Sequence, residues 1–204
     1  MKKIILAILF LSTLSSCSTL LSKLYGVNNL KKFDKEKYNH FITSIEHTGI
    51  EIKSFYADTT SYLQIRNLTK NPVVKKTLSQ PVQILYFDKN EKLTSIQANC
   101  YAKGGLGHLN WNTNGRFNYF IPTSAINIKK EYLSIKDFTA CYPNKDFELN
   151  KDYTIIIYWS LILKKISKDA ISTVINNIRK FNKSDDVIIY LVNNDKSLIR
   201  YMNS

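Results

Sequence analysis

The three cysteines of this chain have the side chains with the widest range of chemistry, because a thiol can be acylated, oxidised to a disulfide or used in redox exchange. Cys17 follows a short basic start, an apolar run over residues 4–11, and a small, largely polar stretch over residues 12–16. This order is typical of a secretory signal. The apolar run is far shorter than the roughly 20 residues that a membrane-spanning helix needs. We therefore expect export, with residues 1–16 as a signal peptide.

The last residues of this segment, Leu14-Ser15-Ser16-Cys17, resemble the bacterial lipobox. The resemblance implies that Cys17 receives a diacylglyceryl group on its sulfur and becomes the N-terminus after cleavage. Two or three acyl chains anchor a protein stably, whereas one holds it only marginally. The alternative is an ordinary cleaved signal with an incidental cysteine. Ser18 is not the Asp that this family associates with retention in the inner membrane, so we expect a lipoprotein of the outer membrane that faces the periplasm.

If Cys17 carries lipid, an even pair of cysteines remains, Cys100 and Cys141, in an oxidising compartment. We expect one disulfide between them, closing a loop of about 40 residues and stabilising the fold by about 3 to 4 kcal/mol. The alternative is a reactive redox pair. Reactive dithiols usually lie close together in sequence at a helix N-terminus, whereas these two cysteines are far apart, so the sequence favours the structural disulfide.

The other residue types that carry chemistry form no recognisable catalytic or metal-binding set. His40 and His47 are seven positions apart, too far for one helix face to offer both to one ion, and His108 has no partner at ligand spacing. No Gly-x-Ser-x-Gly occurs, and the acidic residues are dispersed. The glycines of residues 104–107 lack the lysine and hydroxyl of a phosphate-binding loop. We expect no metal, no cofactor and no catalytic activity.

A cluster of aromatic side chains between residues 101 and 124 is the one candidate for a binding surface. Its members are Trp111, Arg116, Phe117, Tyr119 and Phe120, interleaved with asparagines. If exposed, these rings would stack on a sugar or a protein partner, because exposed apolar patches often mark interaction sites. The alternative is that the rings cover a sheet and belong to the core.

The composition is that of a globular protein. The net positive charge indicates either an anionic partner or a basic, solvated surface without a specific ligand. Hydrophobic residues make up 44% of the chain and charged residues 22%, both ordinary values. The formal net charge of +13 attracts anions. Outside the cytoplasm these are phospholipid headgroups, acidic glycans and lipopolysaccharide phosphates, so nucleic acid is an unsuitable partner. The lysines are scattered singly, which equally fits a solvated surface without a specific ligand.

The periodicity of the chain predicts a short lipid-anchored tether over residues 17–33 and a single α/β or α+β domain over residues 34–204, with halves at 34–124 and 125–204. Strands are predicted over residues 50–57, 82–87, 92–99, 153–159 and 187–192, and helices over 34–47, 58–65, 126–138 and from Ser167 to Phe181. The strands at 82–87 and 92–99 form a hairpin. The last two strands are continuously apolar, as in parallel sheets covered on both faces, and with the helix between them they make a βαβ unit.

This C-terminal unit resembles the first half of a thioredoxin-like fold. Residues 155–160 look like the family's central strand with the Trp that precedes its active-site loop, and residues 192–195 look like the end of the next strand. Where the family has Cys-x-x-Cys, this chain has Leu163-Lys164-Lys165-Ile166, so thiol–disulfide exchange at that place is excluded. The resemblance implies that the remaining strands come from earlier segments, at 50–57 and 82–99.

These observations favour a lipid-anchored envelope protein that acts as a non-catalytic binding or structural module. Its partners would be the membrane, through the lipid on Cys17, and an anionic envelope component or a protein. The alternative is a thiol–disulfide-related redox protein that uses Cys100 and Cys141.

Overall fold

The computed structural model of the 204-residue chain describes residues 27–28, 30–45, 48–104 and 109–203. A five-stranded mixed sheet, ordered β1-β5-β4-β2-β3, forms its centre. The strands are β1 (Glu51–Tyr56), β2 (Gln83–Phe87), β3 (Leu93–Ala98), β4 (Tyr153–Trp159) and β5 (Val187–Asn193). Strands β1, β5 and β4 are parallel, whereas β2 is antiparallel to both β4 and β3. The predicted α/β class is therefore confirmed.

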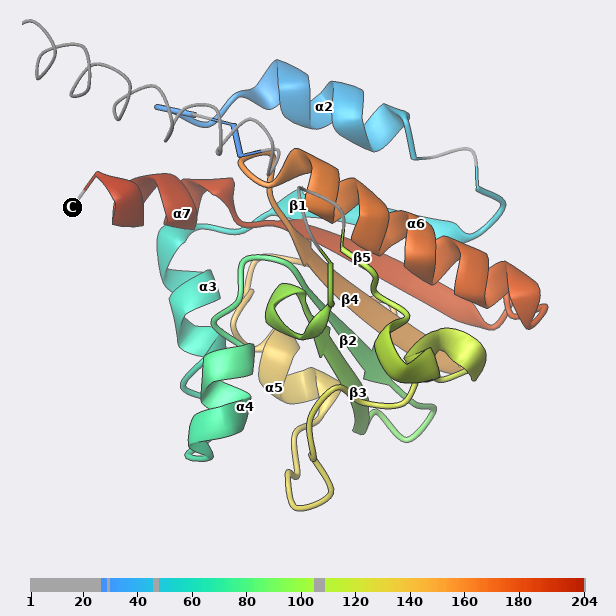
Figure 1. Ribbon diagram of the computed structural model, residues 1–204. Coiled ribbons are helices and arrows are strands. Elements are labelled where there is room, and N and C mark those ends of the chain that lie inside the picture. Colours follow the sequence, from blue (N-terminus) through green and yellow to red (C-terminus); the bar gives the residue numbers. More distant parts are fainter. Residues whose placement is uncertain (1–26, 29, 46–47, 105–108, 204) are drawn as a thin grey trace, which may run out of the picture.

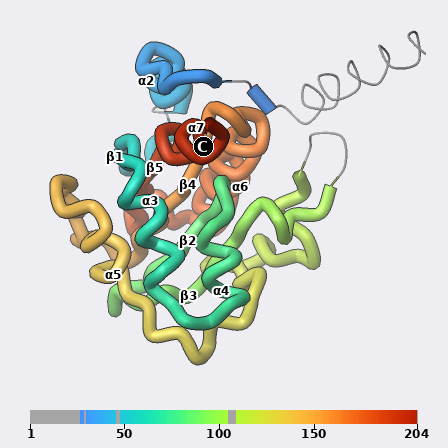
Figure 2. Tube along the Cα trace, turned by 90° about the vertical axis from the view of Figure 1, so that its left-hand side faces the viewer, coloured from blue at the N-terminus to red at the C-terminus, as the bar shows by residue number. Residues whose placement is uncertain are grey.

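Helices cover both faces of the sheet (Figure 1). One face packs against α2 (Lys35–Thr43), α6 (Lys164–Lys180) and the segment that contains Trp111 and Phe117. The other packs against α3 (Thr59–Ile65), α4 (Pro72–Thr77) and α5 (Ile135–Thr139). In Figure 2 the strands run between α6 on one side and α3 and α5 on the other. This double cover explains why β4 and β5 are apolar without alternation.

Side-chain caps determine where several helices begin. The Asp34 carboxylate accepts a hydrogen bond from the backbone N–H of Lys37 and starts α2. Asp58 caps α3 in the same way through the N–H of Ser61, and Asn71 caps α4 ahead of Pro72. Each oxygen satisfies a backbone donor that the first helical turn leaves without an intrahelical partner.

The predicted strands and hairpin are confirmed, as are helices within 34–47 and 58–65. Helix α2 ends at Thr43, earlier than expected, and residues 46–47 lie outside the described part of the chain. The helix predicted over 126–138 is wrong. Only Ile135–Thr139 is helical there, because Ser134 and Asp137 form a capping box that starts α5 late. Ile126 and Ile128 are instead buried two positions apart against the sheet. Short helices α4 and α7 (Asp195–Met202) were not predicted.

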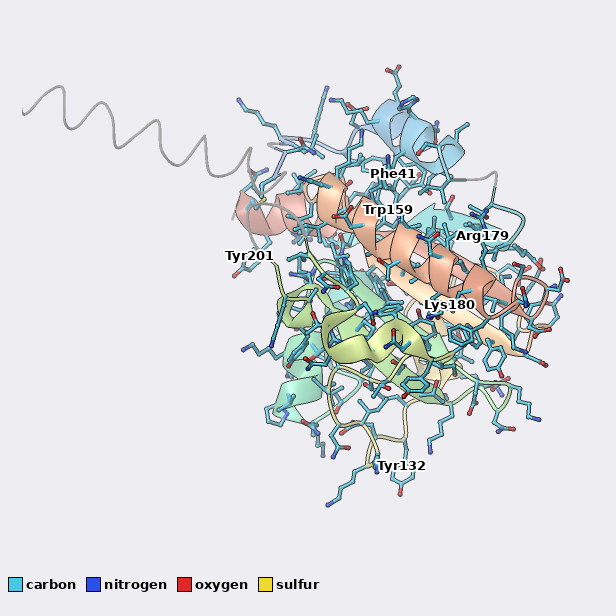
Figure 3. The ribbon with its side chains drawn as sticks, turned by 45° about the vertical axis from the view of Figure 1, so that its right-hand side comes forward. Phe41, Tyr132, Trp159, Arg179, Lys180 and Tyr201 are labelled. Carbon is cyan, nitrogen blue, oxygen red and sulfur yellow. The ribbon has the colours of Figure 1, made fainter. Side chains whose placement is uncertain are left out.

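Strands from both predicted halves of the domain join in one sheet, as the earlier segments at 50–57 and 82–99 supply β1, β2 and β3. Strand β4 is the central strand, and Trp159 is its last residue. Its indole is completely buried and stacks on Phe41 of α2, with ring centroids 4.4 Å apart (Figure 3). The sheet order agrees with what the thioredoxin-like resemblance requires of the earlier segments, while the resemblance itself stays a prediction.

Candidate functional site

The three parallel strands end in one row, and this edge of the sheet is the candidate site. Tyr56, Asn193 and Trp159, the last residues of β1, β5 and β4, are partners in the strand register. Polar residues follow directly: Asp58 after β1, and Ser160 after β4. In open α/β sheets, ligands bind outside the carboxyl ends of parallel strands. We call this edge the carboxyl edge.

A buried carboxylate lies at the centre of this edge. Asp195, the first residue of α7, is completely shielded from solvent. Its oxygens accept hydrogen bonds from the Ser160 hydroxyl at 2.5 Å, the Leu161 backbone N–H at 2.9 Å and the Asn193 side-chain amide at 2.8 Å. An isolated buried carboxylate is very costly, so these donors are what make its position tolerable. The carboxylate ties the end of β5 to the loop that follows β4.

The hydroxyl groups of two serines also hold this loop, residues 160–163, in place. The Ser160 oxygen accepts a hydrogen bond from the N–H of Ile162 at 3.0 Å. The Ser167 hydroxyl, one turn into α6, accepts from the N–H of Ser160 at 3.1 Å and donates to its carbonyl at 3.0 Å. The expectation that Ser167 caps this helix is wrong: α6 begins at Lys164, and Ser167 uses its hydroxyl on the buried loop instead.

The outer side of the same loop holds the N-terminal segment. The backbone N–H of Asn28 donates to the Ile162 carbonyl and its side-chain amide donates to the Leu161 carbonyl, both at 2.7 Å. Leu161 and Ile162 therefore direct their N–H groups towards Asp195 and their carbonyls towards Asn28. Leu30 packs partly buried against the core beside this contact. The described part of the predicted tether is thus docked on the domain.

A cavity of about 290 Å³ adjoins this contact. It is lined by Asn28, Leu30, Leu161 and two lysines, Lys37 of α2 and Lys164 of α6. Lys37 also forms an ion pair of 3.0 Å with Asp34, so its charge is partly compensated, whereas Lys164 is exposed and pairs with no carboxylate of the described residues. The cavity presents a net positive wall next to the point where the N-terminal segment enters the fold.

A second cavity of about 230 Å³ lies at the end of β1 and also contains two lysines. The ammonium of Lys196, in the first turn of α7, lies 4.0 Å from the ring centroid of Tyr56, and that of Lys145 lies 5.9 Å from it. Both contacts are cation–π interactions that hold the lysines over one ring. Asp58 lines the same cavity, but backbone N–H donors, chiefly that of Ser61, hold the pKa of its carboxyl below the ordinary value. Its charge is committed to capping α3.

The polar groups of the carboxyl edge hold backbone groups in place. Ser160 and Asp195 have the residue types of a nucleophile and an acid, yet both are completely buried and the serine proton is directed to the carboxylate. Tyr142 lines the second cavity, and burial raises the pKa of its phenol, which therefore stays protonated. Within the described residues, no three His, Cys, Asp or Glu side chains gather as metal ligands would. The arrangement can hold a loop in place and offer lysines to an anion.

The predicted disulfide is not formed, because Cys100 and Cys141 are both free thiols. Cys100 follows β3, one edge of the sheet, whereas Tyr142 next to Cys141 packs on Phe55 of β1, the opposite edge. The Cys141 thiol instead donates to the carbonyl of Asp137 in α5, with the sulfur and oxygen 3.6 Å apart. Loss of hydration raises the pKa of both thiols, which disfavours the reactive thiolate and weakens the redox alternative.

The aromatic cluster proposed as a binding surface belongs to the core for the most part. Trp111, Phe117 and Arg116 are buried, and Phe120 is half-buried with its ring 5.0 Å from that of Tyr153. Only Tyr119 of the five is exposed. The Arg116 guanidinium donates to the carbonyl of Tyr101 at 2.8 Å instead of projecting towards solvent. The cluster covers the sheet, so it is not a stacking surface for a sugar.

The other predicted site residues lie partly outside the described chain. Cys17, His47 and His108 are among these, and their placement is not part of the structure. His40 is exposed on α2. Leu163 is the N-cap residue of α6, and Lys164, Lys165 and Ile166 are the first residues of this helix. In the described part of the chain, no helix combines the length and the hydrophobicity needed to cross a bilayer.

Sequence reasoning missed the group formed by Ser160, Asn193 and Asp195. One signal was available: the two continuously apolar strands were predicted to be parallel neighbours, Ser160 directly follows the first, and Asn193 and Asp195 lie at or just after the end of the second. Carboxyl ends of neighbouring parallel strands meet at one edge, so the serine and the carboxylate had to lie close together. The docking of Asn28 on the loop had no such signal.

Comparison with known proteins adds no relative: no protein-family model, no curated protein and no solved structure matches this chain.

Proposed function

We propose that this protein is a lipid-anchored component of the bacterial cell envelope, held by an acylated Cys17, whose folded domain is a non-catalytic binding module. The observation that carries the proposal is the use made of Asp195. Its buried carboxylate binds the inner side of the loop that follows β4, and the outer side of this loop binds Asn28. This attachment at the carboxyl edge fixes where a segment that leads from a lipid anchor would enter the domain.

The binding role is supported by the pair of lysines in the cavity at the end of β1. Lys145 and Lys196 both contact the ring of Tyr56, while the carboxylate of Asp58 is occupied by backbone donors. A lysine ammonium is a compact point charge suited to phosphate or carboxylate. We infer an anionic envelope component as the ligand of this cavity. The outer membrane, on its periplasmic side, is the location that the lipobox-like sequence favours.

Metabolic labelling with a fatty acid tests the anchor. The full-length chain expressed in bacteria should incorporate label, fractionate with membranes and lose its first 16 residues, because cleavage precedes Cys17. Cys17→Ala should abolish incorporation, whereas Cys100→Ala should leave it unchanged. An unlabelled chain that keeps its leader and remains in the cell interior would refute the proposal.

Calorimetric titration with inorganic phosphate tests the cavity. Binding should be lost when Lys145 and Lys196 are both replaced by Ala, since the two charges that define the cavity are then removed. The matched control replaces Lys89 and Lys92, which are exposed in the turn between β2 and β3 at the opposite end of the sheet. Equal binding by both double variants would show that the cavity is not the anion site.

A further inference from the structure

The carboxyl edge and the N-terminal segment lie at the same end of the molecule. Asn28 binds the loop after β4, and Phe33 packs on Tyr56, the last residue of β1, with ring centroids 5.0 Å apart. Only ten positions separate Cys17 from Val27, the first described residue. Ten residues reach at most about 35 Å when fully extended and roughly 17 Å as a random coil. If Cys17 is acylated, this end of the domain is the one held nearest to the bilayer.

Lysines without ion pairs gather at that end. They are Lys31, Lys32, Lys145, Lys164 and Lys196, which we call the basic face. None of them pairs with a carboxylate of the described residues. Lys31 and Lys32 lie in the docked N-terminal segment, between Leu30 and Phe33. Lys164 lines the cavity at Asn28. Lys145 and Lys196 line the cavity at the end of β1.

The acidic residues at this end are already engaged. Asp34 pairs with Lys37 and caps α2, Asp58 caps α3, and Asp195 is buried within its own hydrogen bonds. Two exposed carboxylates have no such role: Glu36 on α2, and Asp146, which directly follows Lys145.

At the opposite end of the sheet, several lysines are neutralised by neighbours. Lys136 pairs with Glu91 at 2.7 Å, and Lys183 pairs with Asp186 at 2.7 Å. Lys151 lies 3.7 Å from Glu51, the first residue of β1. Lys89 and Lys92 in the hairpin turn are exposed and form no ion pair within the described residues. What distinguishes the basic face is its place beside the N-terminal segment and the two cavities that its lysines line.

We propose that the basic face docks on the surface of an anionic bilayer and seats phospholipid headgroup phosphates in the two lysine-lined cavities. This inference rests on the proposed function, because the acylated Cys17 brings the face to the membrane. Lysines near an anionic leaflet each strengthen attachment by roughly fivefold. The lipid anchor prevents escape, and the basic face then sets the orientation of the domain: the carboxyl edge towards the bilayer and the hairpin turn at residues 88–92 away from it. Figure 2 views the molecule from the side on which α7 and α3 lie in front, close to this edge.

Lysine footprinting on vesicles tests the orientation. The full-length protein, purified in its acylated form, is reconstituted into vesicles of phosphatidylethanolamine and phosphatidylglycerol, or of phosphatidylcholine alone. Amine acetylation is then followed at each lysine by mass spectrometry. On the anionic vesicles, acetylation of the basic face should slow by about fivefold or more, while Lys89 and Lys92 in the hairpin turn react at the same rate on both. High salt should remove the protection, because exposed charges are screened.

Charge reversal supplies the second arm. Replacing Lys31 and Lys164 by Glu should restore rapid acetylation of Lys145 and Lys196 on anionic vesicles, whereas the matched reversal of Lys89 and Lys92 should not. The intact mass of the purified chain shows whether it is acylated, so failure of the proposed function can be told apart from failure of the docking proposal. A chain without the lipid overturns the proposed function. An acylated chain whose basic face reacts equally fast on both kinds of vesicle, or is equally protected on both, overturns the docking proposal alone.

Discussion

Removal of the Asp195 carboxylate is the most direct test of how the carboxyl edge is built. In Asp195→Ala, the Ser160 hydroxyl, the Leu161 N–H and the Asn193 amide lose the acceptors that they reach at 2.5, 2.9 and 2.8 Å. A buried donor without a partner costs about 1 to 3 kcal/mol, so we expect the free energy of unfolding to fall by about 3 to 5 kcal/mol. This is a large part of the roughly 5 to 15 kcal/mol by which domains are stable.

Urea unfolding followed by circular dichroism measures this loss, and it should appear in thermal melts as a Tm lower by roughly 10 °C. Asp195→Asn keeps one acceptor oxygen and should lose less, about 1 to 2 kcal/mol. The matched control is Asp185→Ala. Asp185 is an exposed acid just before β5, the strand that leads to Asp195, and its replacement should change the free energy of unfolding by less than about 0.5 kcal/mol.

Hydrogen exchange localises the effect. The amides of Asn28, Leu161 and Ile162 should exchange faster in Asp195→Asn, because the loop they share loses its inner attachment. If Asp195→Ala unfolds within about 0.5 kcal/mol of the natural chain, or if Asn28 keeps its protection when Leu161 loses it, the proposed coupling between the carboxylate and the N-terminal segment is wrong.

Three further results are expected. Trp111→Ala should cost about 3 to 5 kcal/mol in urea unfolding, because the indole is buried, and Tyr119→Ala less than about 0.5 kcal/mol; equal costs would contradict the core assignment. Thiol titration in the absence of reductant should find Cys100 and Cys141 both unoxidised, with Cys141 reacting only after denaturation; no titratable thiol would restore the disulfide. Asp58→Ala should cost about 1 kcal/mol at neutral pH. The pKa of Asp58 is lower in the folded state, so its contribution to stability is present above the unfolded-state pKa near 3.8 and disappears as the pH falls through the folded-state pKa. A cost of Asp58→Ala that persists in strong acid would refute the capping role, as would a similar cost for Asp58→Asn at neutral pH.

Local signals accounted for much of the fold. The apolar runs that became β4 and β5 are long, continuous and rich in β-branched residues, so they had one plausible structure. Asp34 and Asp58 marked helix starts because their side chains satisfy backbone donors only a few positions away. Such interactions depend on neighbours in the sequence, which is why they could be predicted.

Other assignments depended on distant partners, so the sequence left them open or predicted them wrongly. The aromatic cluster has the composition of a binding loop, but the burial of Trp111 is decided by the sheet and α6 beneath it. The cysteines were paired by counting, whereas the strand order places Cys100 at one edge of the sheet and Cys141 towards the other. A periodic run of apolar residues predicted a helix over 126–138, yet Ile126 and Ile128 pack individually on the sheet.

The amino-acid sequence alone determined the strands, the α/β class and the lipobox-like position of Cys17. Each of these follows from residues within a few positions of one another. Only the tertiary structure brought Leu161, Asp195 and Asn28 together, across 34 positions on one side and 133 on the other. It likewise placed Lys145 and Lys196, which are far apart in the chain, at the same cavity. The physical reason is that parallel strands return to the same edge after each crossover, so residues far apart in sequence meet where those strands end.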